Sequence, residues 1–420
     1  MSNTSQDPGS VPQDFQLKSL NLINSKGVAL DVHFLMIELS TFESIFNTAI
    51  TGWLVLNDSR NLLSNYPIFG FDKIQMVFAT PNREEFEMMF YIYKITDRKL
   101  VKEREQVYIL HLVAQEQIDD FKVRVSKSYK GQLISDIVQD LHTNQLGSSQ
   151  PITVESTQFL HHIIVPNLHP MQAISWLATR ATPANWNGSN YLYYQDKNGF
   201  NFVTGETLLS SQPVAQYTYQ PANVRDQAAQ TTYKPRDPMD EKAMTEWDFG
   251  SQSDIITNLS DGMYGNQLLT HDLTNKVYNN YTFDYPDSYN SYQHLTPNML
   301  FSAAWPDNRN SSAARMKLHS EGQEPFPFKP SSWLPMRTSQ LRQLNNIIIE
   351  MGIPGHSSRT VGQVVNLLIP SPEPPVNGQQ VYDPFYRGKY LISGLRHKID
   401  QDHYTTTMTL VQDSVFQAYP

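Results

Sequence analysis

Alternating apolar and polar positions dominate the first third of the chain and predict β-strands. Residues 15–34 alternate on both sides of a turn at 24–27, which indicates a hairpin. Further strands are expected at 50–59, 72–80, 84–99 and 105–116, and at most one short helix, near Thr41 to Asn47. About six strands in roughly 100 residues favour a small barrel or sandwich.

Helical spacing replaces this alternation in the next part of the chain. Apolar residues recur every three to four positions between Leu133 and Leu141. Residues 159–167 predict a strand, and Pro170 is suited to the first position of a helix. A hairpin with an Asn-Gly turn at 198–199 follows. We therefore expect an α+β domain over 123–212.

The last part of the chain alternates again and predicts a second barrel or sandwich over 336–420. Its expected strands include one that leads into a turn at Pro354-Gly355 and a closing antiparallel pair at 388–400 and 403–415. Residues 213–335 are expected to give this barrel one strand, from 213–232, followed by an insertion rich in tyrosine and asparagine. A mobile polar arm is expected at 1–14 and the first barrel at 15–122. The sequence thus predicts a mainly β protein, with two barrel domains and an inserted α+β domain.

The composition agrees with a folded, β-rich protein and excludes several kinds of binding and catalytic site. Only 17% of the residues are charged, and 11% are aromatic. The formal charge is −9 and no block of lysine and arginine occurs, which disfavours a basic groove for nucleic acid. The absence of cysteine excludes disulfides and thiolate chemistry. We expect no membrane span, because no apolar run reaches the length of one, and no secretory signal.

Three histidines lie close together, at His161, His162 and His169. Adjacent strand residues point to opposite faces, so His161 and His162 cannot easily share a metal. A site would need His161 and His169 to meet through tertiary structure, and no HExxH helix supports one. The favoured interpretation is a strand that leads into a helix, with the histidines at a surface or interface.

Signatures of catalysis are scarce. The sequence contains no GxSxG, GxGxxG or GxxxxGK[ST] motif. Two carboxylates could serve a glycosidase, but a solvated strand or turn explains the following residues better: Glu84, Glu85, Glu103 and Glu105. We therefore assign no catalytic, cofactor-binding or metal-ligating residue and expect no enzyme and no cofactor.

The run YNNYTFDYPDSYNSY, residues 278–292, is the strongest binding candidate. Its tyrosines could stack on sugars, fill an interface with a protein partner, or pack within their own domain. The sequence leaves these three roles open.

Three stretches together resemble the central baseplate hub of contractile-tailed bacteriophages. FESIFNTAITGWLVLNDSRNLLSNYPIFGFDKIQMVFATP is similar to the first barrel of that family. YKGQLISDIVQDLHTNQLGS, FLHHIIVPNLHPMQAISWLATRA and NYLYYQDKNGFNFVTGETLL resemble its inserted α+β domain. IPGHSSRTVGQVVNLLIP, GKYLISGLRHKID and YTTTMTLVQDS resemble its closing barrel. The resemblance covers most of residues 15–415 and is weakest over 213–335.

The resemblance implies a structural protein of the virion tail tip, assembled in the host cytoplasm. Hubs of this family are homotrimers with two tail-tube-type barrels in each subunit, an architecture shared with the type VI secretion spike. The six barrels form a pseudo-hexameric ring that adapts the six-fold tail tube to the three-fold spike. DNA passes through its channel without specific binding.

The implied partners are the tail tube protein, the central spike protein and the surrounding baseplate proteins. The resemblance gives no active site to carry over, and it treats the strand and helix around His161 and His169 as structural. Two alternatives remain: a peptidoglycan-degrading tail enzyme, and a sugar-binding tail protein that recognises a receptor.

Overall fold

The computed structural model describes most of the chain, and most of its regular elements are strands, so the expected mainly β fold is confirmed. The described ranges are 15–68, 70–80, 86–219, 223–225, 233–235, 243–252, 254–273, 275–300, 314–318, 330–374, 381–401 and 403–418. The arm expected at 1–14 lies outside them. Within them, no helix is both long enough and apolar enough to cross a membrane.

The N-terminal strands surround one apolar core. They follow the order β2-β1-β5-β6-β7-β4-β3 in a sheet of antiparallel pairs. The bounds are β1 (Gln16–Ile23), β2 (Ala29–Asp31), η1 (His33–Leu35), β3 (Met36–Ser44), β4 (Thr51–Asp58), α1 (Leu62–Asn65), β5 (Lys73–Ala79), β6 (Phe86–Lys102) and β7 (Glu105–Ala114). The hairpin expected at 15–34 is confirmed as β1 and β2.

The helix expected near Thr41 to Asn47 is wrong. Most of that segment belongs to β3, which pairs with β4 on one edge and with a C-terminal strand on the other. Two ladders of backbone hydrogen bonds outweigh the weak helical spacing of these few residues, because tertiary pairing overrides local propensity.

The C-terminal strands form a closed barrel. The bounds are β13 (Gln216–Tyr219), β16 (Ala243–Met244), β17 (Glu246–Gln252), β21 (Ile347–Pro354), β22 (Val364–Leu368), β23 (Gly388–Asp400) and β24 (Tyr404–Gln412). The pairings run β13-β22-β23-β24-β21-β17, and β16, which directly precedes β17, pairs back to β13. The predicted closing pair, β23 and β24, is confirmed.

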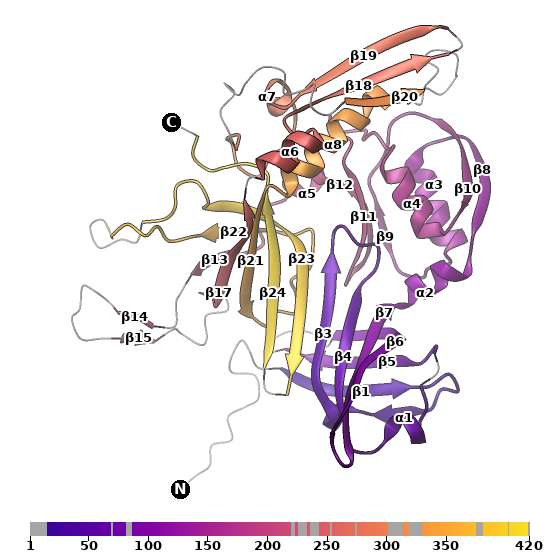
Figure 1. The fold of residues 1–420 in the computed structure, drawn as a ribbon, viewed down its shortest axis with the longest axis vertical. Coiled ribbons are helices and arrows are strands. Elements are labelled where there is room, and N and C mark those ends of the chain that lie inside the picture. The colour runs from indigo at the N-terminus through magenta and orange to yellow at the C-terminus, as the bar shows by residue number, and fades with distance from the viewer. Residues whose placement is uncertain are drawn as a thin grey trace.

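One long strand, β23, belongs to both groups of strands. Its first residues pair with β22, and its later residues pair with β3 from Gly394↔Ser44 to Asp400↔Glu38. Ile399 and Tyr404, at the tip of the β23–β24 hairpin, are buried in the core of the N-terminal strands. Figure 1 shows β23 and β24 (yellow) beside β3 and β4 (indigo). The two groups of strands are therefore parts of one continuous sheet.

The α+β region packs against this sheet from the side, in the purple part of Figure 1. Its elements are α2 (Gln115–Lys122), β8 (Val125–Gln132), α3 (Ile134–Asp140), η2 (Leu141–Gln145), β9 (Ile152–Val154), β10 (His161–Leu168), α4 (Pro170–Ala178), β11 (Tyr191–Asp196), β12 (Gly199–Thr204) and α5 (Gly205–Leu209). The predicted helix around 134–141, the strand, the helix that begins at Pro170 and the Asn-Gly hairpin are confirmed.

The remaining elements form a sheet and helices that project beyond the second barrel, at the top of Figure 1. They are α6 (Ile255–Asp261), β18 (Gly265–Asp272), β19 (Val277–Asp284), α7 (Tyr285–Ser288), η3 (Tyr289–Ser291), β20 (Ala314–Leu318), η4 (Pro330–Ser332) and α8 (Leu334–Leu344), with a small hairpin of β14 (Asn223–Arg225) and β15 (Tyr233–Pro235) elsewhere. Strands pair in the order β19-β18-β20.

Truncating Ile399 tests whether the C-terminal hairpin completes the N-terminal core. Ile399 is 2% exposed, so we expect Ile399→Ala to lower the free energy of unfolding by about 2–5 kcal/mol. Urea denaturation followed by far-ultraviolet circular dichroism measures this loss. The control is Thr405→Ala, on the exposed face of the same hairpin, which should change stability by less than about 0.5 kcal/mol. Equal, small effects of both changes would contradict the shared core.

Candidate functional site

The three histidines that are close in sequence have different environments in the structure. On β10, His161 is buried and His162 is exposed, as expected for neighbours on a strand. His169 precedes α4, and its Nδ1 lies 2.8 Å from the carbonyl oxygen of Val123. In the part of the chain that the structure describes, no three metal-ligating side chains gather in one place. Burial lowers the pKa of His161.

The carboxylates considered for catalysis occupy turn and strand positions. Glu103 is exposed in the turn between β6 and β7, and Glu105 lies 3.0 Å from Lys102 in an ion pair across that turn. Glu84 and Glu85 lie outside the described residues. A solvated turn therefore accounts for Glu103 and Glu105.

Several tyrosines of the 278–292 run pack within the protein. Tyr285 and Tyr289 are buried with Phe283 in a small core, where the two tyrosine rings meet edge to face at 5.5 Å. Tyr278 is 58% exposed. Intradomain packing therefore explains the centre of the run, and its outer end stays available for contact.

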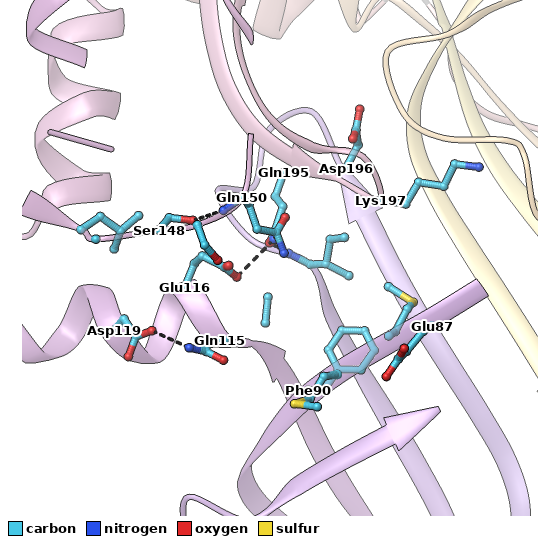
Figure 2. Close-up of a pocket in the computed structure, with 17 residues that line it drawn as sticks. Glu87, Phe90, Gln115, Glu116, Asp119, Ser148, Gln150, Gln195, Asp196 and Lys197 are labelled. Atoms are coloured by element: carbon cyan, nitrogen blue, oxygen red, sulfur yellow. Dashed lines mark hydrogen bonds between the residues drawn. The ribbon is translucent and has the colours of Figure 1, made fainter. Parts of the chain in front are cut away.

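A polar pocket of about 260 Å³ lies where the first barrel meets the α+β region (Figure 2). Its lining comes from β6, the start of α2, the loop after η2 and the end of β11. Gln195 spans this joint: its Oε1 accepts the Ile50 N–H at 3.0 Å, and its amide nitrogen donates to Glu116 at 3.4 Å. Burial raises the pKa of Glu116.

Another acid of the pocket wall, Asp196, caps the β11–β12 turn. Its Oδ1 accepts the Asn198 N–H at 2.7 Å and the Gly199 N–H at 3.1 Å, and Oδ2 accepts the Asn201 side-chain amide at 3.0 Å. Burial nevertheless raises the pKa of this carboxyl. The hydrogen-bonding capacity of Asp196 thus supports the turn, and the pocket acts as a polar seam between domains.

Lys197 points away from Glu116, toward the second barrel (Figure 2). Its Nζ donates to the carbonyl oxygen of Ser357 at 2.6 Å, and the Ser357 hydroxyl lies 2.8 Å from that of Thr80. The loop between β21 and β22 is thereby tied to the α+β region and to the end of β5.

Glu43 binds the same loop from β3. Its Oε2 accepts the Thr360 hydroxyl at 2.6 Å and the Val361 N–H at 3.3 Å. The side chain is buried, and this burial raises its pKa to about 7, with a further rise from the nearby Asp196 charge. Burial and Lys197 together lower the pKa of the neighbouring His397 to about 4. This buried group of side chains joins three regions of the fold.

A second joint depends on Arg337 of α8. Its Nη1 donates to the carbonyl oxygens of Ala178, Ser189 and Tyr191, at 3.2, 3.1 and 2.9 Å. Burial lowers the pKa of this guanidinium to about 10, and it remains charged at neutral pH. Arg337 therefore holds α8 to the end of α4 and the start of β11.

The sequence analysis did not predict these contacts between regions, and it did not predict α2. A signal for the first joint existed: Gln195, Asp196 and Lys197 interrupt an otherwise aromatic hairpin just before its Asn-Gly turn. The sequence around Glu43 or Arg337 gives no signal of their contacts, because their partners lie more than a hundred residues away along the chain.

Comparison with known proteins identifies the type of protein. No protein-family profile matches the chain. It is 21% identical over 405 residues to the probable baseplate hub protein gp334 of Vibrio phage KVP40, which covers 90% of this chain and 89% of that protein. The chain therefore resembles a phage baseplate hub protein over most of its length.

Solved structures agree on the fold of this hub-like protein. The 43 kDa tail protein of prophage MuSo2 from Shewanella oneidensis has a TM-score of 0.57 at 8% identity, over 94% of this chain and 99% of that one. The tail protein from Neisseria meningitidis MC58 has a TM-score of 0.52 at 10% identity, over 94% and 96%. The expected resemblance to phage hubs is thus confirmed, and a structural role in a tail or baseplate is supported.

The free energy of unfolding should depend on pH through the buried carboxyl group of Glu43. Its pKa rises from 4.5 to about 7 on folding, so its contribution is fully present below pH 4.5 and is lost as the pH rises to 7. We expect Glu43→Gln to remove this loss, which amounts to about 3 kcal/mol. Urea denaturation at several pH values between 4 and 8 gives the difference between variant and wild type. Glu103→Gln, in an exposed turn, is the matched control and should leave the profile unchanged.

Two arginines of α8 should differ sharply in their importance. Arg337→Ala leaves three carbonyl groups without their donor, so we expect a loss of about 2–4 kcal/mol in unfolding free energy. Arg342 forms a half-exposed ion pair with Asp261, so Arg342→Ala should cost less than about 1 kcal/mol. Thermal and urea denaturation measure both. Similar losses would contradict the special role of the buried guanidinium.

Proposed function

We propose that this hub-like protein is the central baseplate hub of a contractile phage tail, and that three copies form a pseudo-hexameric ring. The observation that carries the proposal is the continuous sheet through β3 and β23, which fixes two barrel units side by side in one chain. Three such chains supply six barrel units, as a six-fold tube requires, and keep three-fold symmetry for a spike.

Exposed apolar side chains support assembly into a larger particle. Large side chains that are more than 60% exposed occur on the first barrel, the α+β region and the insertion: Phe34, Phe71, Leu100, Phe121, Ile164, Ile256 and Leu273. Single exposed apolar residues are common on monomers, but protein interfaces also bury exposed apolar surface. The proposed partners are further copies, the tail tube protein, the central spike protein and the surrounding baseplate proteins, assembled in the host cytoplasm into the virion tail tip.

The proposed ring leaves a channel for DNA. Three copies carry three times −9, or −27, formal charges. Like charges repel the phosphate backbone, so DNA should slide through an acidic channel without binding. A positive lumen in a structure of the assembled ring would contradict this part of the proposal.

Mass and shape in solution test the ring. We expect light scattering coupled to size exclusion to give three times 48.1 kDa, and negative-stain images of that peak to show a ring with a central hole. A compact monomer at micromolar concentration would contradict the proposal. Zymography on cell-wall peptidoglycan and binding to a glycan array then test the two alternatives, the wall-degrading enzyme and the sugar-binding tail protein.

A further inference from the structure

His294 lies between two groups that can only accept hydrogen bonds. Its Nδ1 is 2.6 Å from Asp413 Oδ2, and its Nε2 is 2.9 Å from the carbonyl oxygen of Tyr289. A neutral imidazole has one donor and one acceptor nitrogen, so it can satisfy one of these partners and must oppose the other. Both contacts are satisfied at once when both nitrogens carry protons. Beside an ionised Asp413, the geometry therefore favours an imidazolium.

The ion pair is buried and well supported. The side chains of His294 and Asp413 are 8% and 3% exposed. The Tyr289 ring stacks on the imidazole, with centroids 3.8 Å apart and planes 8° from parallel. The second oxygen of Asp413 accepts the Leu295 N–H at 3.2 Å and the Ser414 hydroxyl at 2.9 Å.

The same contacts fasten a whole segment to the end of the second barrel. The Thr296 N–H and hydroxyl both donate to the Ser414 hydroxyl oxygen, at 2.9 and 2.7 Å. Asn298 and Val415 exchange backbone hydrogen bonds at 3.3 and 2.9 Å. The residues that follow η3 are thus held to the residues that follow β24, with the ion pair at one end of the contact.

Ser414, His294 and Asp413 are not arranged for nucleophilic catalysis. The Ser414 hydroxyl donates to Asp413, and neither ring nitrogen of His294 is free to take its proton. Ser414 is also completely buried. The group is a contact between segments.

The other titratable groups around His294 favour its charge. Glu206 of α5 accepts the N–H groups of Gly188 and Gln293, at 2.7 and 3.2 Å, and its charge acts on the imidazole. The phenols of Tyr285, Tyr289 and Tyr292 lie beside the two acids, and burial raises the pKa of all three. At neutral pH the charged neighbours are therefore acids only.

We propose that His294 and Asp413 form a proton-dependent latch that holds residues 285–298 of the tyrosine-rich insertion against the end of the second barrel. The latch is closed while the imidazole is doubly protonated. Loss of one proton turns one of its two contacts into opposed lone pairs and leaves the Asp413 carboxylate buried without its counter-ion. The segment then separates from residues 413–416 in a local opening, while the barrels stay folded.

The direction of the pH dependence follows from the folded state. Burial alone would lower the pKa of His294, but the hydrogen bond and charge of Asp413, together with Glu206, raise it above 6.5. Stability from the latch is therefore fully present below pH 6.5 and is lost as the pH rises through the raised value. This device acts within one chain and does not depend on the proposed ring.

Hydrogen exchange of the full chain between pH 6 and 9 tests the latch. After correction for the intrinsic pH dependence of exchange, protection of the peptide that contains Leu295 and Thr296 should fall about tenfold for each unit above the raised pKa. His294→Gln should lower this protection at pH 6 and remove its pH dependence. The matched control is His403→Gln, because His403 is exposed and lies 3.5 Å from Asp400 at the other end of β24.

A measurement on the unaltered protein guards against variants that fail to fold. With histidine-selective ¹⁵N labelling, the His294 ring should show two protonated nitrogens at pH 6. A neutral ring at that pH would overturn the proposal. So would protection of residues 293–298 that stays constant from pH 6 to 9.

Discussion

The pairing of β23 with β3 is the constraint on which the rest of the structure depends. It joins strands that are more than 300 residues apart and makes the two barrels share one sheet. Each backbone hydrogen bond in such a ladder contributes little by itself, but a shared core adds the burial of Ile399 and Tyr404 in the neighbouring barrel. A movement of one barrel relative to the other would break both the ladder and this core.

The α+β region shares an apolar core with the second barrel, through residues such as Leu192 and Val203, and buried polar groups add directional contacts between the regions. Glu43, Lys197 and Arg337 bind backbone atoms of other segments, and backbone partners cannot change rotamer. Buried charges are expensive to desolvate, so they are weak sources of stability but strict in their geometry. Apolar packing alone would tolerate sliding, whereas these polar contacts fix the angle between regions. A ring assembled from several copies needs that angle to be the same in every copy.

The sequence predicted the elements far better than their partners. Strand alternation around β1, β21 and β24 and the helical spacing of α3 are local signals, and each element was found where expected. The helix near Thr41 failed because β3 is defined by ladders on both of its edges, which no local pattern contains. The burial of Glu43 could not be predicted for the same reason, since an acidic residue on a strand normally faces solvent.

Glu43 and His294 respond to a change of pH in the same direction. Glu43 has its pKa raised because its charge is buried, and His294 has its pKa raised because its charge is required by two acceptors. The causes are opposite, yet both groups lose protons as the pH rises, and the folded state then loses stability at each of them. Glu43 lies in the β3–β23 ladder itself, opposite Leu395, whereas His294 lies outside the sheet. Because the backbone hydrogen bonds of the ladder do not titrate, the pairing of the two barrels persists while rising pH acts on Glu43 within the sheet and on His294 in the insertion.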